Sequence, residues 1–343
     1  MDMPLDQSNP VGRFLRTWRR EIVRGAVLFG LVVVAGLAVS GVHVGFPAPW
    51  NALRSFSGFD AGEGDPFGPG REIGDRWEWR GVVKPTQTVW IRNTNGPIEV
   101  VAGTGSTLEV IAEKSWRHSQ PSGVEIVPVQ TEEGVTICAL WRARERRCAD
   151  GGDYHLGGVR RNDVAVRFTV KLPRGVRIDV STVNGEVGIE GAAAPVEAAT
   201  VNGRIVAHTS VGPVKGTTMN GSIEARIDAL TGGDVELETM NGSITAILPD
   251  KLNAELEAQT MNGRVDTDFP LQATGKISPR HAHGTIGAGG LGLKLSTVNG
   301  SIAIRRASTA ATQADSSRAQ WTPRPVRRTT VRVQKAPTPP PQP

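Results

Sequence analysis

From about residue 76 to residue 304, apolar and polar residues alternate with a period of two, and glycine or Asn-Gly interrupts the alternation at short intervals. This pattern is typical of β-strands that bury one face. No stretch of this region repeats its apolar residues with the helical period over a useful length. The pattern therefore predicts an all-β domain over residues 76–304.

One short motif, Thr-x-Asn-Gly-x-Ile/Val, recurs through the second half of this domain. The steps between its successive asparagines are 18, 18, 21, 21 and 37 residues, and HAHGTIGA, with His283 in the asparagine's place, divides the last step into 21 and 16. A period near 20 residues indicates a repeat protein in which each copy adds one coil. The segment VWIRNTNGPIEV, residues 89–100, fits the same frame, so the sheet is expected to begin there. The asparagines concerned are Asn95, Asn184, Asn202, Asn220, Asn241, Asn262 and Asn299.

A threonine stands two residues before the asparagine in every intact copy. Counting from the asparagine, positions −6, −4, −2 and 0 share one face of a strand, and apolar residues at +3 and +5 resume the inward face. The threonine and asparagine are therefore expected to point inward, where stacked copies would hydrogen-bond to one another. The glycine after the asparagine would let the backbone turn a corner. The expected threonine ladder contains Thr182, Thr200, Thr218, Thr239, Thr260 and Thr297.

Together these expectations describe a β-solenoid, or β-roll, of stacked 16–21-residue coils over residues 176–304, with neighbouring asparagines about 4.8 Å apart. The alternative is a meander in which every Asn-Gly forms the tip of a separate hairpin. The repeat lapses over residues 101–175. Longer strands there, with a charged tip at 142–163, predict an antiparallel cap over the N-terminal end of the stack.

The N-terminal region carries a predicted membrane segment. Residues 25–46 contain no Asp, Glu, Lys or Arg and are long enough to cross a bilayer as a helix. Five arginines precede them, which predicts that residues 1–24 stay in the cytoplasm and that everything after residue 46 is exported. Small residues at 38–41 leave a cleaved signal peptide open as an alternative to this signal-anchor. The sequence thus predicts a single-pass protein of the inner, or cytoplasmic, membrane with a periplasmic or extracellular β domain.

The net charge of +5 is unevenly distributed along the chain. Residues 1–24 hold five Arg against three acidic residues, and residues 305–343 hold seven Arg and one Lys against one Asp, so the stretch between them is negative. A nucleic-acid-binding domain would carry the basic charge on the folded part itself, so no nucleic-acid partner is expected. Residues 47–75, rich in Gly, Pro and Asp, predict a flexible linker, and the Arg/Pro-rich residues 305–343 predict a disordered tail.

Few residues suggest chemistry. His281 and His283 could bind a metal but have no third ligand in the sequence, and they fit a divergent coil instead. Asp266 and Asp268 resemble the paired carboxylates of sugar-cleaving β-helix enzymes, yet no acidic groove continues on neighbouring coils. The sequence therefore predicts a protein that is not an enzyme and has no cofactor or metal. A cluster of tryptophans before the repeats is expected to close the N-terminal end of the core: Trp77, Trp79, Trp90, Trp116 and Trp141.

The two cysteines, Cys138 and Cys148, flank a short charged stretch that could form a hairpin tip. Outside the cytoplasm a disulfide between them is plausible. Two unrelated free thiols are the alternative.

The NTNGPIEV segment, the stretch VKLPRGVRIDVSTVNGEVGIEG and the series of Thr-x-Asn-Gly coils resemble the DUF4097 "putative adhesin" family over about residues 86–304. The resemblance implies a bacterial membrane-anchored or secreted β-solenoid-like protein of the cell envelope, often near membrane-stress signalling systems. It implies a loosely assigned adhesin role and no catalytic residues. The basic tail and the cysteine pair depart from the simplest members of the family.

We therefore expect a membrane-anchored, exported β-solenoid that acts as an adhesin-like or scaffold protein of the bacterial cell envelope. Its contacts would be the membrane, through residues 25–46, and an envelope protein or polymer that the sequence does not identify. The first alternative is an accessory or sensor protein of an envelope-stress signalling system. A polysaccharide-active enzyme is a further, less favoured alternative. The oligomeric state is not predicted.

Overall fold

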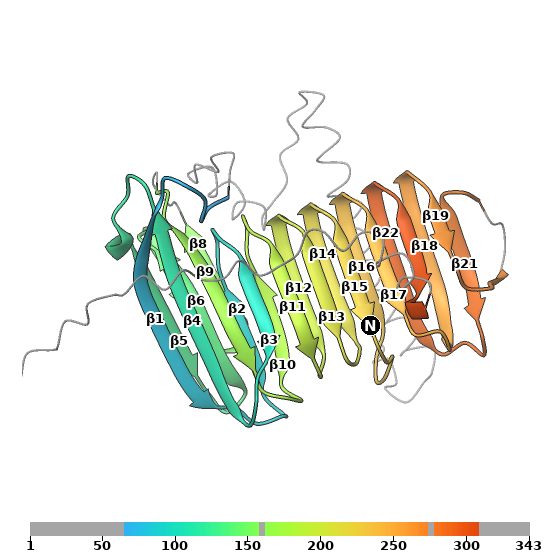
Figure 1. The fold of residues 1–343 in the computed structure, drawn as a ribbon, viewed down its shortest axis with the longest axis horizontal. Coiled ribbons are helices and arrows are strands. Elements are labelled where there is room, and N and C mark those ends of the chain that lie inside the picture. The colour runs from blue at the N-terminus through green and yellow to red at the C-terminus, as the bar shows by residue number, and fades with distance from the viewer. Residues whose placement is uncertain (1–64, 158–161, 274–277, 309–343) are drawn as a thin grey trace, which may run out of the picture. The chain divides into compact units, whose positions relative to one another are not determined.

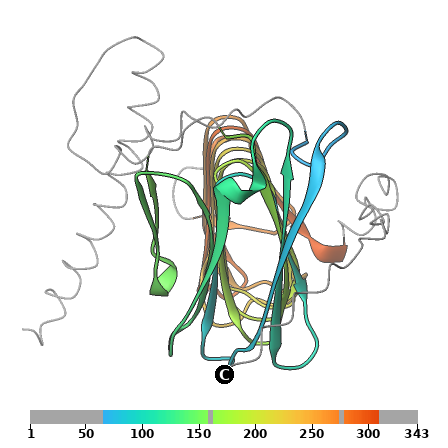
Figure 2. The ribbon, with the colours of Figure 1, turned by 90° about the vertical axis from the view of Figure 1, so that its left-hand side faces the viewer.

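The computed structural model describes residues 65–157, 162–273 and 278–308. These residues form two long β-sheets that face each other, with a two-stranded hairpin packed against one of them (Figures 1 and 2). The prediction of an all-β domain is confirmed. The membrane segment at 25–46, the cytoplasmic segment 1–24 and most of the tail lie outside the described residues. Within the described ranges, no helix is long and apolar enough to span a membrane.

The first sheet has ten strands. In spatial order they are β1 (Glu72–Val82), β4 (Thr107–Trp116), β9 (Ala165–Leu172), β3 (Ile98–Ala102), β11 (Val187–Ala192), β13 (Ile205–Thr209), β15 (Ile223–Ile227), β17 (Ile244–Leu248), β23 (Ile302–Arg306) and β19 (Val265–Thr267).

The second sheet has eleven strands. In spatial order they are β20 (Gln272–Ala273), β21 (His281–Ile286), β18 (Ala254–Asn262), β22 (Leu291–Asn299), β16 (Val235–Asn241), β14 (Val214–Asn220), β12 (Val196–Asn202), β10 (Arg177–Ser181), β2 (Thr88–Arg92), β6 (Gly134–Trp141) and β5 (Val124–Gln130). The separate hairpin consists of β7 (Glu145–Cys148) and β8 (Tyr154–Gly157).

Each coil contributes one strand to each sheet, and neighbouring coils pair in parallel and in register. Thr200 of β12 lies opposite Thr218 of β14, and Ile205 of β13 lies opposite Ile223 of β15. This is the arrangement that the Thr-x-Asn-Gly repeat predicted, with two strands per coil. The coils traced in the described residues are β2/β3, β10/β11, β12/β13, β14/β15, β16/β17, β22/β23 and β18/β19.

The order of the coils in space differs from their order in the sequence. The last coil, β22/β23, lies between β16/β17 and β18/β19 (Figure 1). Its complete Thr-Asn-Gly motif lets it pair with a coil on either side. At this end the stack therefore does not follow the order of the sequence.

The segment around His283 does not form a coil, which corrects the prediction of a degenerate repeat there. His281 and His283 lie on β21, which runs antiparallel to β18 at the end of the stack. Because this strand has histidines where the threonine and asparagine of the motif would stand, it cannot continue the parallel stack, and it covers the edge of β18 instead.

The N-terminal cap is mixed rather than wholly antiparallel. Strand β4 is antiparallel to both β1 and β9, but β9 joins the first coil in parallel through β3, and β6 joins it in parallel through β2. The folded part also begins earlier than predicted. Strand β1 starts at Glu72, and Phe67 is buried beneath the guanidinium of Arg167, 4.0 Å from its ring centroid. Residues 65–75 therefore belong to the domain and not to the linker.

The core lies between the two sheets. In the cap it contains large side chains, of which Trp141 and Phe168 are fully buried, whereas Trp77, Trp79 and Trp116 pack against it while remaining partly exposed. Trp90 is an exception to the predicted cluster. It belongs to β2 but lies close to Gly152 of the loop between β7 and β8, on the outer face of the second sheet. A residue at an alternate strand position must face outward, because successive side chains point to opposite faces.

Candidate functional site

The motif asparagines form a single file of side-chain hydrogen bonds. Every asparagine after Asn184 donates Nδ2–H to the Oδ1 of the preceding asparagine in the file at 2.8–2.9 Å. In spatial order the file is Asn184, Asn202, Asn220, Asn241, Asn299 and Asn262. Asn95 does not join it, because its Nδ2 donates instead to the carbonyl of Val164, at 3.1 Å, which belongs to the segment leading into the cap strand β9.

The asparagines do not point inward, which corrects the prediction. Burial alternates regularly from Val196 to Thr200 along β12, but Asn202, at the end of the strand, is exposed. At this position the chain leaves the pair of facing sheets, so no opposite strand covers the side chain. Each amide in the file therefore keeps hydrogen-bonding capacity toward solvent. The file is an exposed polar edge of the molecule.

The motif threonines are buried, as predicted, but they do not bond to one another. Thr218 Oγ1 donates to the main-chain carbonyl of Gly203 in the preceding coil at 2.9 Å. A buried hydroxyl and a buried carbonyl thereby satisfy each other. The same contact, at 2.8–3.1 Å, is made by Thr182, Thr200, Thr239, Thr260 and Thr297.

The corner glycines are required by close packing between coils. A Cβ atom on Gly203 would lie 1.9 Å from the carbonyl oxygen of Gly185, and one on Gly221 would lie 2.0 Å from that of Gly203. An Asn-Gly hairpin tip would instead need positive φ at both residues. Among the described residues other than glycine, Asp75 alone has a positive φ. The interpretation of the motif as separate hairpin tips is therefore wrong.

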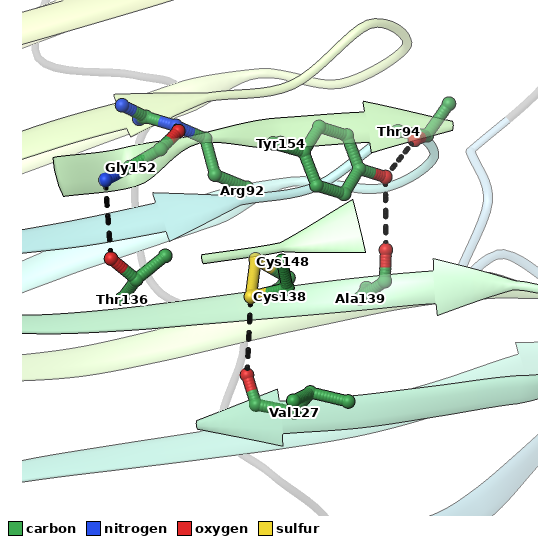
Figure 3. Close-up of a disulfide and its surroundings, with 9 residues drawn as sticks. All are labelled: Arg92, Thr94, Val127, Thr136, Cys138, Ala139, Cys148, Gly152 and Tyr154. Atoms are coloured by element: carbon green, nitrogen blue, oxygen red, sulfur yellow. Dashed lines mark hydrogen bonds between the residues drawn. A yellow bond between two sulfur atoms is a disulfide. The ribbon is translucent and has the colours of Figure 1, made fainter. Parts of the chain in front are cut away.

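A disulfide joins Cys138 of β6 to Cys148 of β7 and fastens the small hairpin to the second sheet (Figure 3). The Tyr154 hydroxyl donates to the carbonyl of Ala139 at 2.9 Å and lies 2.6 Å from Thr94 Oγ1. Burial raises the pKa of Tyr154, so this hydroxyl stays protonated. The hairpin is thus held at one side by the disulfide and at the other by the tyrosine.

Arg92 fixes the loop of the same hairpin. Its guanidinium binds both oxygens of Asp179 at 2.7 and 2.8 Å and donates to the carbonyl of Gly152 at 2.9 Å. The Gly152 N–H donates in turn to Thr136 Oγ1 at 3.2 Å (Figure 3). These contacts cover Trp90 and part of the outer face of the second sheet.

A hollow of about 190 Å³ lies on the outer face of the first sheet, over β3, β11, β13 and β15. Its apolar part includes Gly188, Val206 and Val101. Glutamate side chains and two basic groups stand around this part: Glu99, Glu186, Glu190, Glu224, Arg204 and His208. The hollow could accept a group that combines an apolar stem with a positive charge.

His208 stands between two carboxylates of this hollow. Its Nδ1 lies 3.0 Å from Glu190 Oε2, and its Nε2 lies 3.8 Å from Glu224 Oε1. The interaction with Glu224 raises the pKa of His208 above its ordinary value, burial opposes the shift, and the charge of Glu190 reinforces it. His208 in turn lowers the pKa of Glu224. The imidazole therefore carries a positive charge to higher pH than a free histidine.

The carboxylates of Asp266, on β19, and of Asp268, directly after this strand, bind a single partner. Arg305 Nη2 lies 2.7 Å from Asp266 Oδ2, and Nη1 lies 2.9 Å from Asp268 Oδ1. This pairing fastens the short edge strand β19 to β23. A shallow depression beside it is lined by Gly263, Arg264 and Ser301, together with these charged groups.

His281 and His283 lie side by side on β21 with ring centroids 6.4 Å apart. Within the described ranges, no group of three His, Cys, Asp or Glu side chains is placed to hold a metal ion.

Sequence reasoning missed the hollow and the contacts of Arg92. The hollow depends on which outward residues of four separate coils become neighbours, and that follows only from the register. One signal was available. Gly188 interrupts the outward positions of β11 with a residue that has no side chain, in a strand where no turn is needed.

The family comes from a comparison with family models. A family model described as Toastrack DUF4097 matches residues 86–305. Three solved structures are similar. A "putative cell adhesion protein" from Clostridium sporogenes has a TM-score of 0.40 and 11% identity, over 68% of this chain and 100% of that one. A "putative adhesin" from Bacteroides fragilis has a TM-score of 0.24 and 10% identity, over 68% and 97%.

The third structure is a "putative adhesin" from Parabacteroides distasonis. Its TM-score is 0.21 and its identity 9%, over 68% of this chain and 97% of that one. No curated protein matches the sequence.

Proposed function

Because residues 86–305 match its model, the chain belongs to the Toastrack DUF4097 family, and on this premise we propose that it is an exported scaffold or adhesin-like protein of the bacterial cell envelope. Residues 25–46 anchor it in the inner membrane, and the two-sheet stack outside the cytoplasm contacts an envelope protein or polymer. In this role the chain catalyses no reaction and needs no cofactor.

The observation that carries the proposal is the disulfide between Cys138 and Cys148. Disulfides persist in oxidising compartments and are rare where glutathione and thioredoxin keep thiols reduced. Here the bond holds a hairpin against the second sheet, so an oxidising environment would complete the folded structure. This supports export of everything that follows the uncharged residues 25–46.

The stack itself supports a contact role. Parallel coils repeat the same outward positions along both sheets at the strand spacing of about 4.8 Å. Repeat proteins use such extended surfaces to bind partners through many similar contacts.

Thiol trapping tests the location. Cells that make the full chain are quenched in acid, denatured and treated with a maleimide-polyethylene glycol before or after reduction. We expect labelling of Cys138 and Cys148 only after reduction, and a Cys148→Ser variant should label once without it. Labelling of both cysteines before reduction would contradict export.

Crosslinking tests the contact role. A photoreactive amino acid is placed in the full chain within its own membrane, either at the outward Val206 or at the inward Ile205. We expect a crosslinked species that depends on the outward position. Equal crosslinking from both positions, or none from any outward position on either sheet, would contradict a scaffold that binds through its sheet faces.

A further inference from the structure

The hollow on the first sheet results from a missing side chain in a row of larger ones. Across four adjacent strands, the parallel register aligns Glu99, Gly188, Val206 and Glu224 at outward positions. A Cβ atom on Gly188 would meet nothing within 4 Å, so the space above this residue is open. The row therefore has a gap with an apolar wall and a carboxylate at each end.

The next outward row supplies the opposite wall. It aligns Val101, Glu190, His208 and Arg226 on the same four strands. Val101 is 36% exposed, one of the few large apolar side chains of the described residues that are so open to solvent. An exposed apolar side chain beside an open gap marks a place where another molecule would gain by burying apolar surface.

The charge around the hollow is negative and incompletely neutralised. Arg204 pairs with Glu186 at 2.5 Å, and His208 pairs with Glu190 at 3.0 Å. Among the described residues, the carboxylate of Glu99 has no hydrogen-bond or ion-pair partner. The hollow thus offers one free carboxylate, that of Glu99. Glu224 is only loosely paired, because its Oε1 lies 3.8 Å from His208 Nε2.

The size of the hollow limits what can fill it. About 190 Å³ is smaller than the pockets of roughly 300–1,000 Å³ that hold drug-sized ligands. It suits one long side chain, whose methylene groups would lie over Gly188 and Val206 and whose cationic head would reach the glutamates.

From this geometry we propose that the hollow binds an arginine or lysine side chain presented by a partner polypeptide. The proposal rests on the proposed function, because it names the chemistry of the partner that the scaffold contacts. The partner's side chain forms a charge-assisted hydrogen bond with Glu99 and is held between Val101 and Val206. A basic segment of an envelope protein is thereby recognised on the outer face of the first sheet.

The test uses the purified full chain in detergent and a probe peptide, acetyl-Gly-Gly-Arg-Gly-Gly-amide. Binding is followed by NMR through the backbone amides of Gly188 and Val206, and in variants of Gly188 through that of Val206 alone. The matched probe replaces arginine by citrulline, which keeps the shape but not the charge. We expect a saturable shift with the arginine peptide and at least tenfold weaker binding of the citrulline peptide. Equal binding of the two peptides would overturn the proposal.

Two variants locate the site. Gly188→Val fills the gap without a clash, because a Cβ is accommodated and valine favours strands. It should weaken binding at least tenfold with no loss of thermal stability. Thr245→Val adds the same side chain at the corresponding outward position of β17, outside the hollow, and should leave binding unchanged. Unchanged binding in the Gly188→Val variant would overturn the proposal.

This chain's own basic tail is the competing occupant. Without added peptide, the Gly188 amide is compared between the wild-type chain and a variant in which Arg324, Arg327, Arg328 and Arg332 are glutamine. An unchanged signal supports a partner as the source. A shifted signal would assign the hollow to the tail and overturn the assignment to a partner. The experiment needs neither export nor a cellular partner, so its failure is distinguishable from failure of the proposed function.

Discussion

The coils and the N-terminal cap share the same two sheets but are held together by different contacts. From β10/β11 onward, neighbouring coils bond to each other through the same threonine-to-glycine and asparagine-to-asparagine hydrogen bonds. The side chains between the sheets there are aliphatic, and the same type recurs at the corresponding inward site of successive coils, as alanine does at Ala207, Ala225 and Ala246. Each type of contact in the coils therefore occurs several times, once between each pair of neighbouring coils.

The cap contains contacts that occur once. Phe168 and Trp141 fill it, and Lys114 is 7% exposed with its ammonium bound to Asp75 and to the carbonyl of Val124. Asp163 accepts hydrogen bonds from the main-chain N–H groups of residues 117–119. In a repeat protein stability is spread over nearest-neighbour contacts. We infer that the cap concentrates stability in a few side chains, whereas the coils distribute it.

The largest difference should follow removal of a core side chain from the cap. Phe168→Ala deletes a fully buried ring from the core between the two sheets of the cap. We expect a loss of about 4 kcal/mol in the free energy of unfolding, within the usual range for phenylalanine. Chemical denaturation of the purified protein measures it. The coil counterpart Ile205→Val should cost about 1 kcal/mol, and equal losses in the two variants would remove the distinction between the regions.

The corner glycine of each coil has no room for a larger side chain. Gly221→Ala places a methyl group 2.0 Å from the carbonyl of Gly203, so the two coils must separate. Overpacking of this kind costs about 3 kcal/mol. Gly188→Ala is the matched control in a strand of the same sheet stack, and it should gain about 0.5 kcal/mol because its Cβ meets nothing. Similar melting temperatures for both variants would show that the corners are not closely packed.

The hydrogen bonds that Asp163 accepts from residues 117–119, here called the Asp163 clamp, predict that acid destabilises the cap. Burial raises the pKa of Asp163, but its hydrogen bonds with the Ser119 side chain and with the N–H groups of residues 117–119 outweigh this and hold the pKa well below its ordinary value of 3.8. A carboxyl whose pKa is lower in the folded state stabilises the fold above its unfolded pKa. That contribution is lost as the pH falls through the folded pKa.

The measurement is the free energy of unfolding between pH 5 and pH 2. Asp163→Asn keeps the shape of the side chain and removes the charge, so it should cost about 2 kcal/mol at neutral pH and less as the pH falls. Hydrogen exchange should report the loss at residues 117–119 rather than in the coils. An Asp163→Asn cost that stays constant over this pH range would exclude the clamp as a source of acid sensitivity.

The coils were predictable because the motif repeats the local chemistry of every corner. Thr200, Asn202 and Gly203 recur in the same order in each intact copy, and period-two alternation then fixes the sheet faces. The contacts that these side chains make were harder to predict from the sequence. Alternation predicted an inward Asn202, but the strand ends there, and a sequence pattern does not show where an opposite strand stops covering a side chain.

The order of the coils and the hollow were beyond the sequence for another reason. Any complete coil can pair with any other, so nothing local assigns Asn299 a place between Asn241 and Asn262. The hollow needs the lateral register of residues far apart in the chain, such as Glu99 and Gly188. In the cap, Lys114 and Asp163 are polar residues whose burial depends on tertiary contacts that have no period.

The smallest loss of stability is expected in the exposed asparagine file. It tests whether the burial of a hydrogen bond matters more for stability than the number of hydrogen bonds lost. Asn220→Ala removes two side-chain hydrogen bonds, to Asn202 and from Asn241. Water can replace both, so the cost should be only about 1 kcal/mol. Thr218→Val removes a single bond but leaves the buried carbonyl of Gly203 without its partner, and about 2 kcal/mol is expected. If denaturation instead found Asn220→Ala the costlier change, the exposed file and not the buried threonine would hold the coils together.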